Sequence, residues 1–462
     1  MSEVKVRFAP SPTGHMHIGN TRTALFNWLL AQKLGGSFML RIDDTDKERS
    51  KKEYEAEIRD ALQWLGLVWS SEARQSARTE RYREVTAKLI AEGLVYPCYE
   101  TPEELELMRK TLLAKGRPPI YDRRALSLTK EQIAAYEKEG RRPHYRFKLA
   151  PGDIVWKDMV RGRCHYSAEN LSDPVVIRED GSYLYHLPSV VDDTDFAITH
   201  IVRGEDHVTN TASQIRMFEA VGGRVPSFAH LPLLTGREGK LSKRLGSVGV
   251  AELRAEGVEA MAICSYLAKL GTSEAVEPFA DLCSLAESLD LARLGRSQPK
   301  FSEDDLRRFN THLVRGLDYE AVKGRVNVDR EFWNAIRGNL NIVTDSEIWR
   351  GICRRPVRPE LEDRELTSAA AELLPPEPWN EETFAVWTNA VKERTGRKGK
   401  ALFHPLRRDG RRSRTENFTA VDRARTGFPP LERRICIKGE KNAGNVSAQY
   451  VDTPQGEICS VG

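Results

Sequence analysis

Hydrophobic and polar side chains alternate along residues 3–9, and this period of two predicts a β-strand. Prolines and a glycine then break the regularity over residues 10–14, and apolar side chains recur at helical spacing over residues 24–29. His17 falls where that helix is expected to begin. The chain is therefore expected to open with a strand, a loop and a helix.

The same patterns predict the elements that follow. Ser50 and Glu53 are spaced as a capping box ahead of apolar residues at helical spacing, which predicts a helix after the aspartate-rich turn. A second helix is expected over about residues 79–92. A strand over residues 197–203 and a helix from about Asn210 then continue the alternation of strands and helices. This alternation indicates an α/β fold with a parallel sheet.

Short helices and strands are expected over residues 96–187, inside that alternation. Thr101, followed by a proline, is predicted to open a helix, and the Asp-Gly pair at residues 180–181 is predicted to form a hairpin turn. After Arg244 the chain reads almost entirely as helix, with apolar side chains at helical spacing over residues 250–270. An inserted α+β segment and a helical C-terminal part are therefore expected.

Composition agrees with an intracellular protein of about three domains, since 40% of the 462 residues are hydrophobic, and the cytoplasm is the expected compartment. No run approaches the roughly 18 apolar residues that span a bilayer, and no signal peptide is expected. The seven cysteines show neither disulfide nor zinc spacing. The net charge is only +4, so any RNA contact is expected to use local basic patches.

The first motif runs from Arg7 to Asn20 and combines a loop after a strand with a helix N-terminus. In an open α/β sheet, ligands bind beyond the carboxyl ends of the strands, and a helix N-terminus offers free N–H groups to phosphates. Gly19 lets a nucleotide approach the backbone closely. A proline-rich turn with incidental histidines is the alternative for this segment taken alone.

The second motif is the basic segment that contains Lys240, Ser242, Lys243 and Arg244. Two ammonium groups three residues apart, with a hydroxyl between them, can clamp pyrophosphate as charge builds on the leaving group. A solvated basic turn is the commonest fate of such a cluster. Its occurrence about one nucleotide-binding domain after the first motif favours an enzyme that activates an amino acid with ATP.

Together the motifs resemble the HIGH and KMSKS signatures of class I aminoacyl-tRNA synthetases. More narrowly, the chain resembles bacterial glutamyl-tRNA synthetases, of the type that some bacteria hold as a second copy. The resemblance is dense from residue 3 to residue 250. It is carried by four segments: residues 7–19, 41–46, 185–193 and 201–206.

The resemblance implies an α/β fold with a Rossmann-type nucleotide-binding domain, an inserted α+β domain and all-α C-terminal domains. It implies five regions: residues 1–95 with 188–245, the catalytic domain; 96–187, the inserted domain that meets the tRNA acceptor end; 246–320, a helical stem-contact domain; 321–407, a helical anticodon-binding domain; and 408–462, an atypical basic tail.

The implied activity is ATP-dependent attachment of glutamate to tRNA through a glutamyl-adenylate, with transfer to the tRNA 3′ end. ATP and magnesium are the implied cofactors, tRNA-Glu is the implied partner with tRNA-Gln as a second candidate, and a monomer is expected. A degenerate relative that binds tRNA without charging it is the alternative. A glutamine-specific or tRNA-modifying paralogue is disfavoured, because the modifying type lacks the helical domains and Arg203 suits a carboxylate better than an amide.

The resemblance also implies the site residues. The implied glutamate-binding residues are Arg7, Ala9, Ser11, Asp43, Tyr185 and Arg203. The implied ATP-binding residues are His17, Gly19, Asn20, His207, Lys240, Ser242 and Lys243. Of these, the implied catalytic residues are His17, Lys240 and Lys243. No protein nucleophile is needed, so catalysis would rest on positioning and electrostatics.

The chain departs from the family pattern at three places. Asp43 stands where the family usually has glutamate, and His207 stands where it often has tryptophan. Some relatives hold zinc in the inserted domain with Cys and His pairs, whereas this chain has Cys98 followed by Tyr99 and Glu100, and residues 121–124 add no cysteine. Because structural zinc takes four ligands, we predict no zinc here, and no residue of the chain is assigned as a metal ligand.

The tail over residues 408–462 lacks helical periodicity where relatives continue with an apolar helical ending. The tail contains ten Lys and Arg residues and seven Asp and Glu residues, so its net charge is +3 out of +4 for the whole chain. A frame-shifted or replaced terminus is one interpretation, and a basic arm for tRNA is the other. A frame shift predicts that another frame of the coding DNA reads as family-like sequence.

Overall fold

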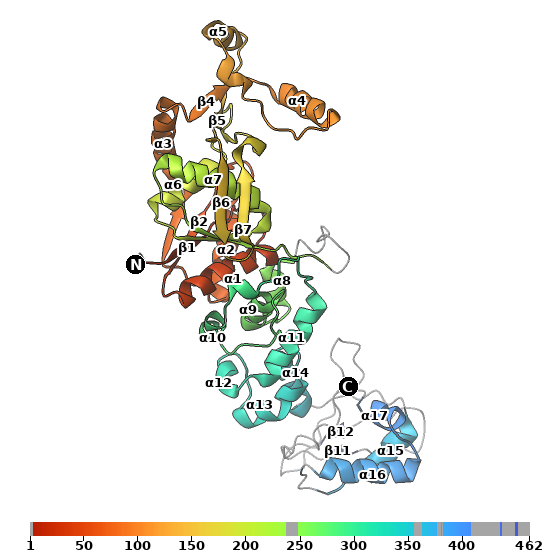
Figure 1. The fold of residues 1–462 in the computed structure, drawn as a ribbon. Coiled ribbons are helices and arrows are strands. Elements are labelled where there is room, and N and C mark those ends of the chain that lie inside the picture. Colours follow the sequence, from red (N-terminus) through yellow and green to blue (C-terminus); the bar gives the residue numbers. More distant parts are fainter. Residues whose placement is uncertain are drawn as a thin grey trace. The chain divides into compact units, whose positions relative to one another are not determined.

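The computed structural model describes residues 3–236, 248–354, 363–376, 380, 382–407, 435–436 and 449–450 (Figure 1). These fall into two compact units, residues 1–309 and residues 310–462. Each unit has its own hydrophobic clusters and is treated by itself.

A five-stranded sheet in the order β10-β9-β1-β2-β3 forms the centre of the first unit, and all of its strand pairs are parallel. Its strands are β1 (Lys5–Phe8), β2 (Ser37–Ile42), β3 (Ser71–Arg74), β9 (His200–Gly204) and β10 (Ser227–Leu231). The parallel sheet and its helical crossovers confirm the predicted α/β class.

Five helices connect or cover these strands: α1 (Ile18–Lys33), α2 (Lys52–Trp64), α3 (Thr79–Ala91), α6 (His186–Asp195) and α7 (Val208–Val221). The predicted opening of strand, loop and helix is confirmed, and His17 is the N-cap of α1. The helix predicted over about residues 79–92 is also confirmed.

The predicted capping box at Ser50 is wrong, because Lys51 is the N-cap of α2 and its side chain makes no capping hydrogen bond. The reason lies in the tertiary structure. The amide of Lys51 donates to the carbonyl of Pro12 at 3.0 Å, and the amide of Ser50 donates to the carbonyl of Asp46 at 3.0 Å. These bonds hold both residues in the loop, so the helix begins one residue later than the local pattern suggests.

The inserted segment contains a three-stranded antiparallel sheet, a separate hairpin and two helices. Its elements are β4 (Val95–Cys98), α4 (Pro102–Ala114), α5 (Lys130–Lys138), β5 (His144–Phe147), β6 (Asp153–Asp158), β7 (Gly162–Ser167) and β8 (Val175–Ile177). The helix predicted after Thr101 is confirmed, with a capping box to Glu104. The turn at residues 180–181 is confirmed too, although the run beyond it forms only an isolated bridge, Ile177 to Tyr183.

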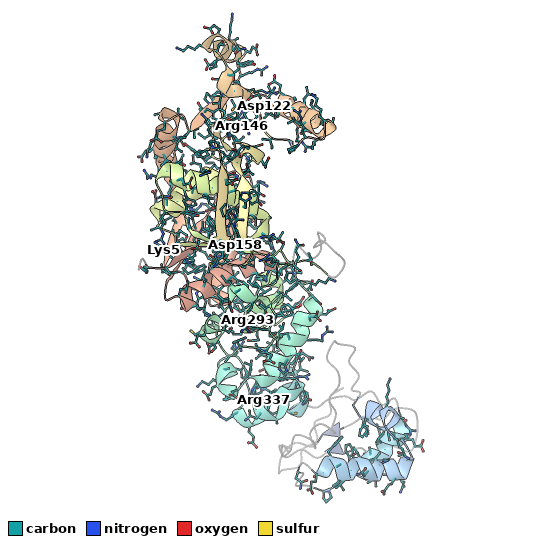
Figure 2. All side chains as sticks on the ribbon, in the orientation of Figure 1. Lys5, Asp122, Arg146, Asp158, Arg293 and Arg337 are labelled. Atoms are coloured by element: carbon teal, nitrogen blue, oxygen red, sulfur yellow. The ribbon has the colours of Figure 1, made fainter. Side chains whose placement is uncertain are left out.

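The β6–β7 hairpin is part of the same hydrophobic core as the parallel sheet. Ile154 and Trp156 of β6 pack in one buried cluster with Phe228 of β10 and Phe218 of α7. Figure 2 labels Asp158, the last residue of β6, where the hairpin reaches the sheet. The inserted segment is therefore joined to the sheet by packing as well as by its chain connections.

After the sheet the first unit continues with α8 (Val250–Ala255), α9 (Ala260–Lys269), α10 (Leu282–Glu287) and α11 (Glu303–Gly316), whose last residues belong to the second unit. The helical pattern over residues 250–270 is confirmed, but residues 256–259 divide it, with Gly257 at φ +84°. Arg22 of α1 is buried and donates to the carbonyls of Pro232 at 2.7 Å and Leu270 at 3.0 Å. Arg22 thus ties α1 to the helical region.

The second unit is mainly helical. Its elements are α12 (Tyr319–Val322), α13 (Arg330–Ile336), α14 (Asp345–Arg354), α15 (Arg364–Glu372), α16 (Thr383–Thr395), α17 (Lys400–Arg407), β11 (Ile435–Cys436) and β12 (Gln449–Tyr450). Trp333 and Trp387 are central to its two hydrophobic clusters. The 3₁₀ turns of the described residues are η1 (Gln75–Arg78), η2 (Arg124–Ser127), η3 (Ala168–Asn170), η4 (Glu205–His207), η5 (Leu291–Arg293) and η6 (Arg337–Asn339). Within the described ranges, no helix has the length and apolar character that crossing a bilayer requires.

Candidate functional site

The parallel sheet gathers the predicted substrate residues at one edge. Arg7 lies near the carboxyl end of β1, Arg203 near that of β9, and Asp43 directly after β2. Strand β1 lies between β9 and β2, so the chain order reverses direction at the β1–β9 pair. Ligands of open α/β sheets bind at such a switch point. The fold therefore brings together three residues that the sequence separates widely.

One buried carboxylate orients two of the arginines in this site. Arg7 donates from Nε and Nη2 to Asp193 at 3.1 and 3.3 Å, and Arg41 donates from Nη1 to the same residue at 2.6 Å. Burial alone would raise the pKa of Asp193, but the charges of Arg7 and Arg41 outweigh it and hold that pKa below its ordinary value. Asp193 is thus a fixed anion at the base of the site.

Arg41 also holds Asp43 in a bidentate ion pair. Its Nε lies 2.7 Å from Oδ1 of Asp43, and its Nη2 lies 3.0 Å from Oδ2. Burial raises the pKa of Asp43 to about 6, against the opposing influence of the Arg41 charge. The amide of Asp43 donates to the carbonyl of Pro10 at 3.0 Å, so this residue lies beside the loop that carries Ala9 and Ser11.

Arg203 differs from the other two arginines because its partners are neutral. Its Nη2 donates to Oγ1 of Thr211 at 2.6 Å and to Oε1 of Gln214 at 2.7 Å. Burial lowers its pKa to about 10, and among the described residues no carboxylate lies within ion-pair distance. A buried guanidinium without a counter-ion is costly. The arrangement therefore suits a ligand that brings its own carboxylate.

Aromatic rings form another side of this site. The Tyr185 ring lies 4.2 Å from the His186 ring and 5.9 Å from the His207 ring, between centroids. Burial lowers the pKa of His186 to about 4, and its Nδ1 has no hydrogen-bond partner among the described residues. Tyr185 and His207, both predicted from the sequence, are therefore neighbours, while the position of His186 was missed.

His17 caps the helix that follows the first strand. Its Nδ1 accepts hydrogen bonds from the amides of Gly19 at 3.1 Å and Asn20 at 3.3 Å. Burial lowers its pKa, which favours the neutral ring with the remaining proton on Nε2. A Cβ at position 19 would lie 3.0 Å from Cε1 of His17, so a larger residue here would press on the imidazole ring. The ring therefore offers an N–H donor at the start of α1.

The predicted basic segment with Lys240, Ser242 and Lys243 lies outside the described residues. Its flanks are described, and both are paired. Gly249 forms an antiparallel bridge with His17, and the amide of Ile18 donates to the carbonyl of Val248 at 3.2 Å. On the other side, Thr235 pairs with Lys300. One end of the segment is thus fixed at the helix N-terminus that carries His17.

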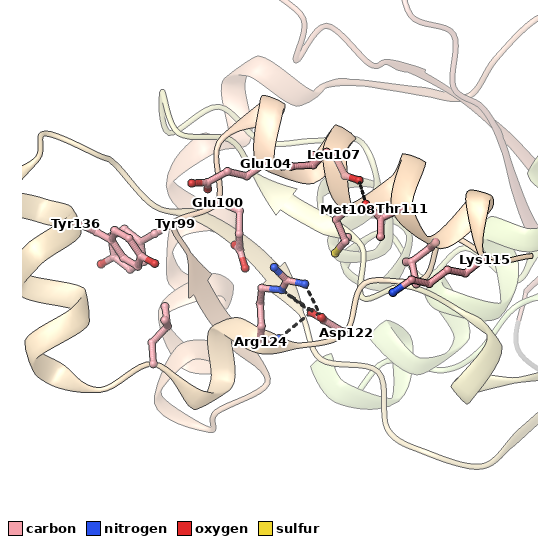
Figure 3. A pocket seen from close by; sticks show the side chains of 12 residues that line it. Tyr99, Glu100, Glu104, Leu107, Met108, Thr111, Lys115, Asp122, Arg124 and Tyr136 are labelled. Carbon is pink, nitrogen blue, oxygen red and sulfur yellow. Dashed lines mark hydrogen bonds and ion pairs between the residues drawn. The ribbon is translucent and has the colours of Figure 1, made fainter. Parts of the chain in front are cut away.

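A separate cavity of about 540 Å³ lies on the inserted segment (Figure 3). Its lining residues come from positions 99–136 and include the stacked rings of Tyr99 and Tyr136 and the ion pair of Arg124 with Asp122. None of the predicted substrate residues lines it. The cavity is therefore distinct from the site at the sheet edge.

Cys98, Glu100 and His144 place three metal-binding atoms within 4.8 Å of one another. The sequence analysis missed His144, which reaches this point because β5 pairs with β4. The residues do not fit zinc well. Tyr121 donates to Glu100 at 2.7 Å, and burial raises the pKa of the Cys98 thiol to about 12, whereas a structural zinc would need Cys98 as a thiolate and a fourth ligand.

We therefore expect the purified protein to hold no stoichiometric zinc. Elemental analysis after extensive dialysis without chelator tests this, with a known zinc protein as the positive control. One zinc per chain that disappears in the variant Cys98→Ser would contradict the expectation and assign the metal to this cluster.

Comparison with known proteins gives consistent matches. The model of the family "tRNA synthetases class I (E and Q), catalytic domain" matches residues 3–308. A glutamate–tRNA ligase of Azospirillum brasilense is 53% identical over 413 residues, which cover 88% of this chain and 92% of the relative. Glutamate–tRNA ligase 1 of Maricaulis maris is 51% identical over 410 residues, which cover 87% of this chain and 92% of the relative.

Solved structures resemble the fold over most of its length. The crystal structure of a glutamate tRNA ligase from Elizabethkingia meningosepticum in complex with its amino acid superposes with a TM-score of 0.74 at 26% identity, and covers 92% of this chain and 97% of the other. A glutamate-tRNA synthetase structure from Elizabethkingia anophelis gives a TM-score of 0.72 at 28% identity, and the match covers 88% of this chain and 93% of the other.

Proposed function

Because the chain belongs to the class I tRNA synthetases for glutamate and glutamine, we propose that it is a glutamate–tRNA ligase. It uses ATP to form glutamyl-adenylate and then transfers the glutamyl group to the 3′ end of tRNA. The observation that carries the choice of substrate is Arg203, a buried guanidinium with only neutral partners among the described residues at the switch point of the sheet. A γ-carboxylate supplies the missing counter-ion, whereas the amide of glutamine does not.

The remaining glutamate contacts follow from the neighbours of Arg203. Arg7 has Nε and Nη2 engaged with Asp193, and its Nη1 is proposed to meet the second carboxylate of the substrate. Asp43 is proposed to face the substrate ammonium group, held in place by Arg41. Tyr185, Ala9 and Ser11 are proposed to complete the pocket.

ATP is proposed to bind at the start of α1. The neutral His17 donates from Nε2 to a phosphate, while Gly19 and Asn20 lie at the same helix terminus. His207, next to Tyr185, is proposed to line the nucleotide pocket. Lys240, Ser242 and Lys243 are proposed to hold the phosphates, and magnesium, when bound, would help to neutralise the negative charge of the leaving pyrophosphate.

The chemistry needs no protein nucleophile. A carboxylate oxygen of glutamate attacks the α-phosphorus of ATP, the bond to the bridging oxygen breaks, and pyrophosphate leaves with the electron pair. A hydroxyl of the terminal tRNA ribose then attacks the acyl carbon, loses its proton, and AMP leaves. The side chains of this chain position the reactants and neutralise developing charge.

The other regions are assigned by proposal as well. Residues 96–187 meet the acceptor end, residues 246–320 contact the stem, and residues 321–407 bind the anticodon arm. The tail over residues 408–462 is either a replaced terminus or a basic arm, as its charge suggests. A cytoplasmic monomer that charges tRNA-Glu, with tRNA-Gln as a second candidate, completes the proposal.

Aminoacylation by the purified chain with ATP, magnesium and labelled glutamate tests this function. The reaction is run separately with tRNA-Glu and tRNA-Gln transcripts and with labelled glutamine as the control amino acid. Charging with glutamate supports the ligase and names its RNA. A folded protein that binds tRNA but forms neither adenylate nor glutamyl-tRNA would instead be the non-charging relative.

The raised pKa of Asp43 predicts a pH dependence of glutamate binding. Because that pKa is about 6, the carboxylate is charged above this pH and becomes neutral below it. We expect the KM for glutamate to rise about tenfold between about pH 7 and about pH 5, because binding of an ammonium group needs the charged form. His186 remains neutral over this range, since burial lowers its pKa to about 4.

The control is Asp43→Asn. We expect this variant to have a high KM for glutamate that does not change with pH between about pH 5 and about pH 7. The KM for ATP, measured in the same samples, separates this effect from titration at His17. A wild-type KM for glutamate that stays constant from about pH 7 to about pH 5 would contradict the assignment of Asp43.

A further inference from the structure

We propose that His230, held by Asp158, is a positioning residue for Arg203. By this arrangement the tip of the β6–β7 hairpin sets the geometry of the glutamate pocket. The proposal rests on the proposed function, because it concerns how the specificity arginine is oriented. Neither Asp158 nor His230 stands out in the sequence, since each lies in a strand without a recognisable motif.

Asp158 is a locked carboxylate at the end of β6, where Figure 2 labels it. Its Oδ1 accepts the amides of Val160 at 3.0 Å, Arg161 at 2.9 Å and His230 at 3.2 Å. Its Oδ2 lies 2.5 Å from Nδ1 of His230. Both side chains are fully buried. The three amides fix which oxygen faces the imidazole, so the carboxylate has one orientation.

This contact decides which nitrogen of His230 carries the proton. A carboxylate only accepts, so Nδ1 carries the hydrogen and Nε2 presents a lone pair. Nε2 lies 2.8 Å from Oγ1 of Thr211 and 3.4 Å from Nε of Arg203. Burial lowers the pKa of His230, which keeps the ring neutral. The guanidinium therefore meets an acceptor at this position and not a second N–H group.

The contacts form one directed series of hydrogen bonds. Arg203 donates to Thr211 at 2.6 Å, Thr211 can donate to His230 at 2.8 Å or to the carbonyl of His207 at 3.1 Å, and His230 donates to Asp158. A donor faces an acceptor at every step only while Asp158 is a carboxylate. The series also places an anion behind the buried arginine, although the two never touch. It thus fixes the plane of the guanidinium while leaving its charge for the substrate.

The tip of the β6–β7 hairpin contacts the region of strands β9 and β10, which carry Arg203 and His230. The amide of Met159 donates to the carbonyl of Phe228 in β10 at 2.8 Å, and Arg161 pairs with Glu205, directly after β9, at 2.8 Å. Strands β9 and β10 pair in register, with Arg203 opposite His230. A displacement of the hairpin tip would therefore move His230 and, through it, Arg203.

The test is D158N, which keeps the shape of the side chain and reverses one hydrogen bond. The three amides hold the remaining oxygen, so the introduced NH₂ faces His230 and drives its proton from Nδ1 to Nε2, against Arg203. We expect the KM for glutamate in adenylate formation to rise about tenfold, with the KM for ATP unchanged. The ¹⁵N shifts of the His230 ring should report the exchange of tautomers.

The matched control is D173N, another buried aspartate of the inserted segment, which accepts from Tyr96, Arg123 and the amide of Leu149. We expect it to leave the KM for glutamate unchanged. A double-mutant cycle with H230Q separates positioning from folding, because the effect of D158N on this KM should vanish once His230 is absent.

Two outcomes would overturn the proposal: an unchanged KM for glutamate in D158N, or an equal rise in the wild-type and H230Q backgrounds. If D158N does not fold, H230Q alone must raise the KM for glutamate and spare that for ATP. If the wild type charges glutamate and D158N has the same KM for glutamate, only this inference is contradicted. If the wild-type protein does not charge tRNA with glutamate, the proposed function itself is contradicted.

Discussion

Arg203→Gln is expected to raise the KM for glutamate by about a hundredfold, because it removes the buried cation that is proposed to pair with the γ-carboxylate. The structure supports this size of effect. The partners of Arg203 among the described residues are neutral, so under the proposed function the substrate would supply the counter-charge of this desolvated group. The preference for glutamate over glutamine should shrink as well, because the introduced Gln side chain can hydrogen-bond to the amide of glutamine as well as to the carboxylate of glutamate. Adenylate formation with each amino acid, at saturating ATP, measures both effects.

The control for this variant is Arg146→Gln, which removes another buried arginine. Arg146 donates to the carbonyl of Asp173 at 2.7 Å and lies over the Tyr121 ring, in the inserted segment. Its replacement should lower stability without changing the KM for glutamate. Unchanged glutamate kinetics in Arg203→Gln would rule out Arg203 as the specificity residue.

Lys243→Ala is expected to lower the rate of adenylate formation by about a hundredfold or more while tRNA binding stays nearly constant. The contact proposed for its ammonium group would strengthen as pyrophosphate departs, so the substitution should weaken binding of the transition state and not of tRNA. ATP–pyrophosphate exchange and tRNA filter binding measure the two quantities.

The control for Lys243→Ala is Lys138→Ala at the end of α5, which removes a surface charge far along the chain from the proposed nucleotide site. This control variant should leave adenylate formation intact. If Lys243→Ala loses as much in the tRNA-binding assay as in the exchange assay, the role given to Lys243 is contradicted.

The sequence predicted the local parts of this site well. The strand, loop and helix of residues 5–33 follow from periodicity and turn residues, and His17 is the N-cap that the pattern indicated. Local patterns succeed there because the information lies within a few residues. The start of α2 was wrong by one residue, because a hydrogen bond from Lys51 to the distant Pro12 decides it.

The partners within the site could not be predicted in the same way. Asp193 binds Arg7 from 186 positions away and Arg41 from 152, and Asp158 binds His230 across 72. Such pairs depend on which strands become neighbours and on which turns reach them. A single sequence carries no periodic signal for that, although Arg41 and Asp193 do lie inside the segments that carry the family resemblance.

The bridge between His17 and Gly249 has a consequence for how the second motif works. Gly249 lies beside the proposed nucleotide site, and Lys240 and Lys243 precede it by nine and six positions in the sequence, so a tether of at most nine residues joins each lysine to this point. A tether this short gives an effective concentration of about millimolar or more. Under the proposed function, neither lysine therefore needs a strong phosphate contact of its own to act on the leaving pyrophosphate.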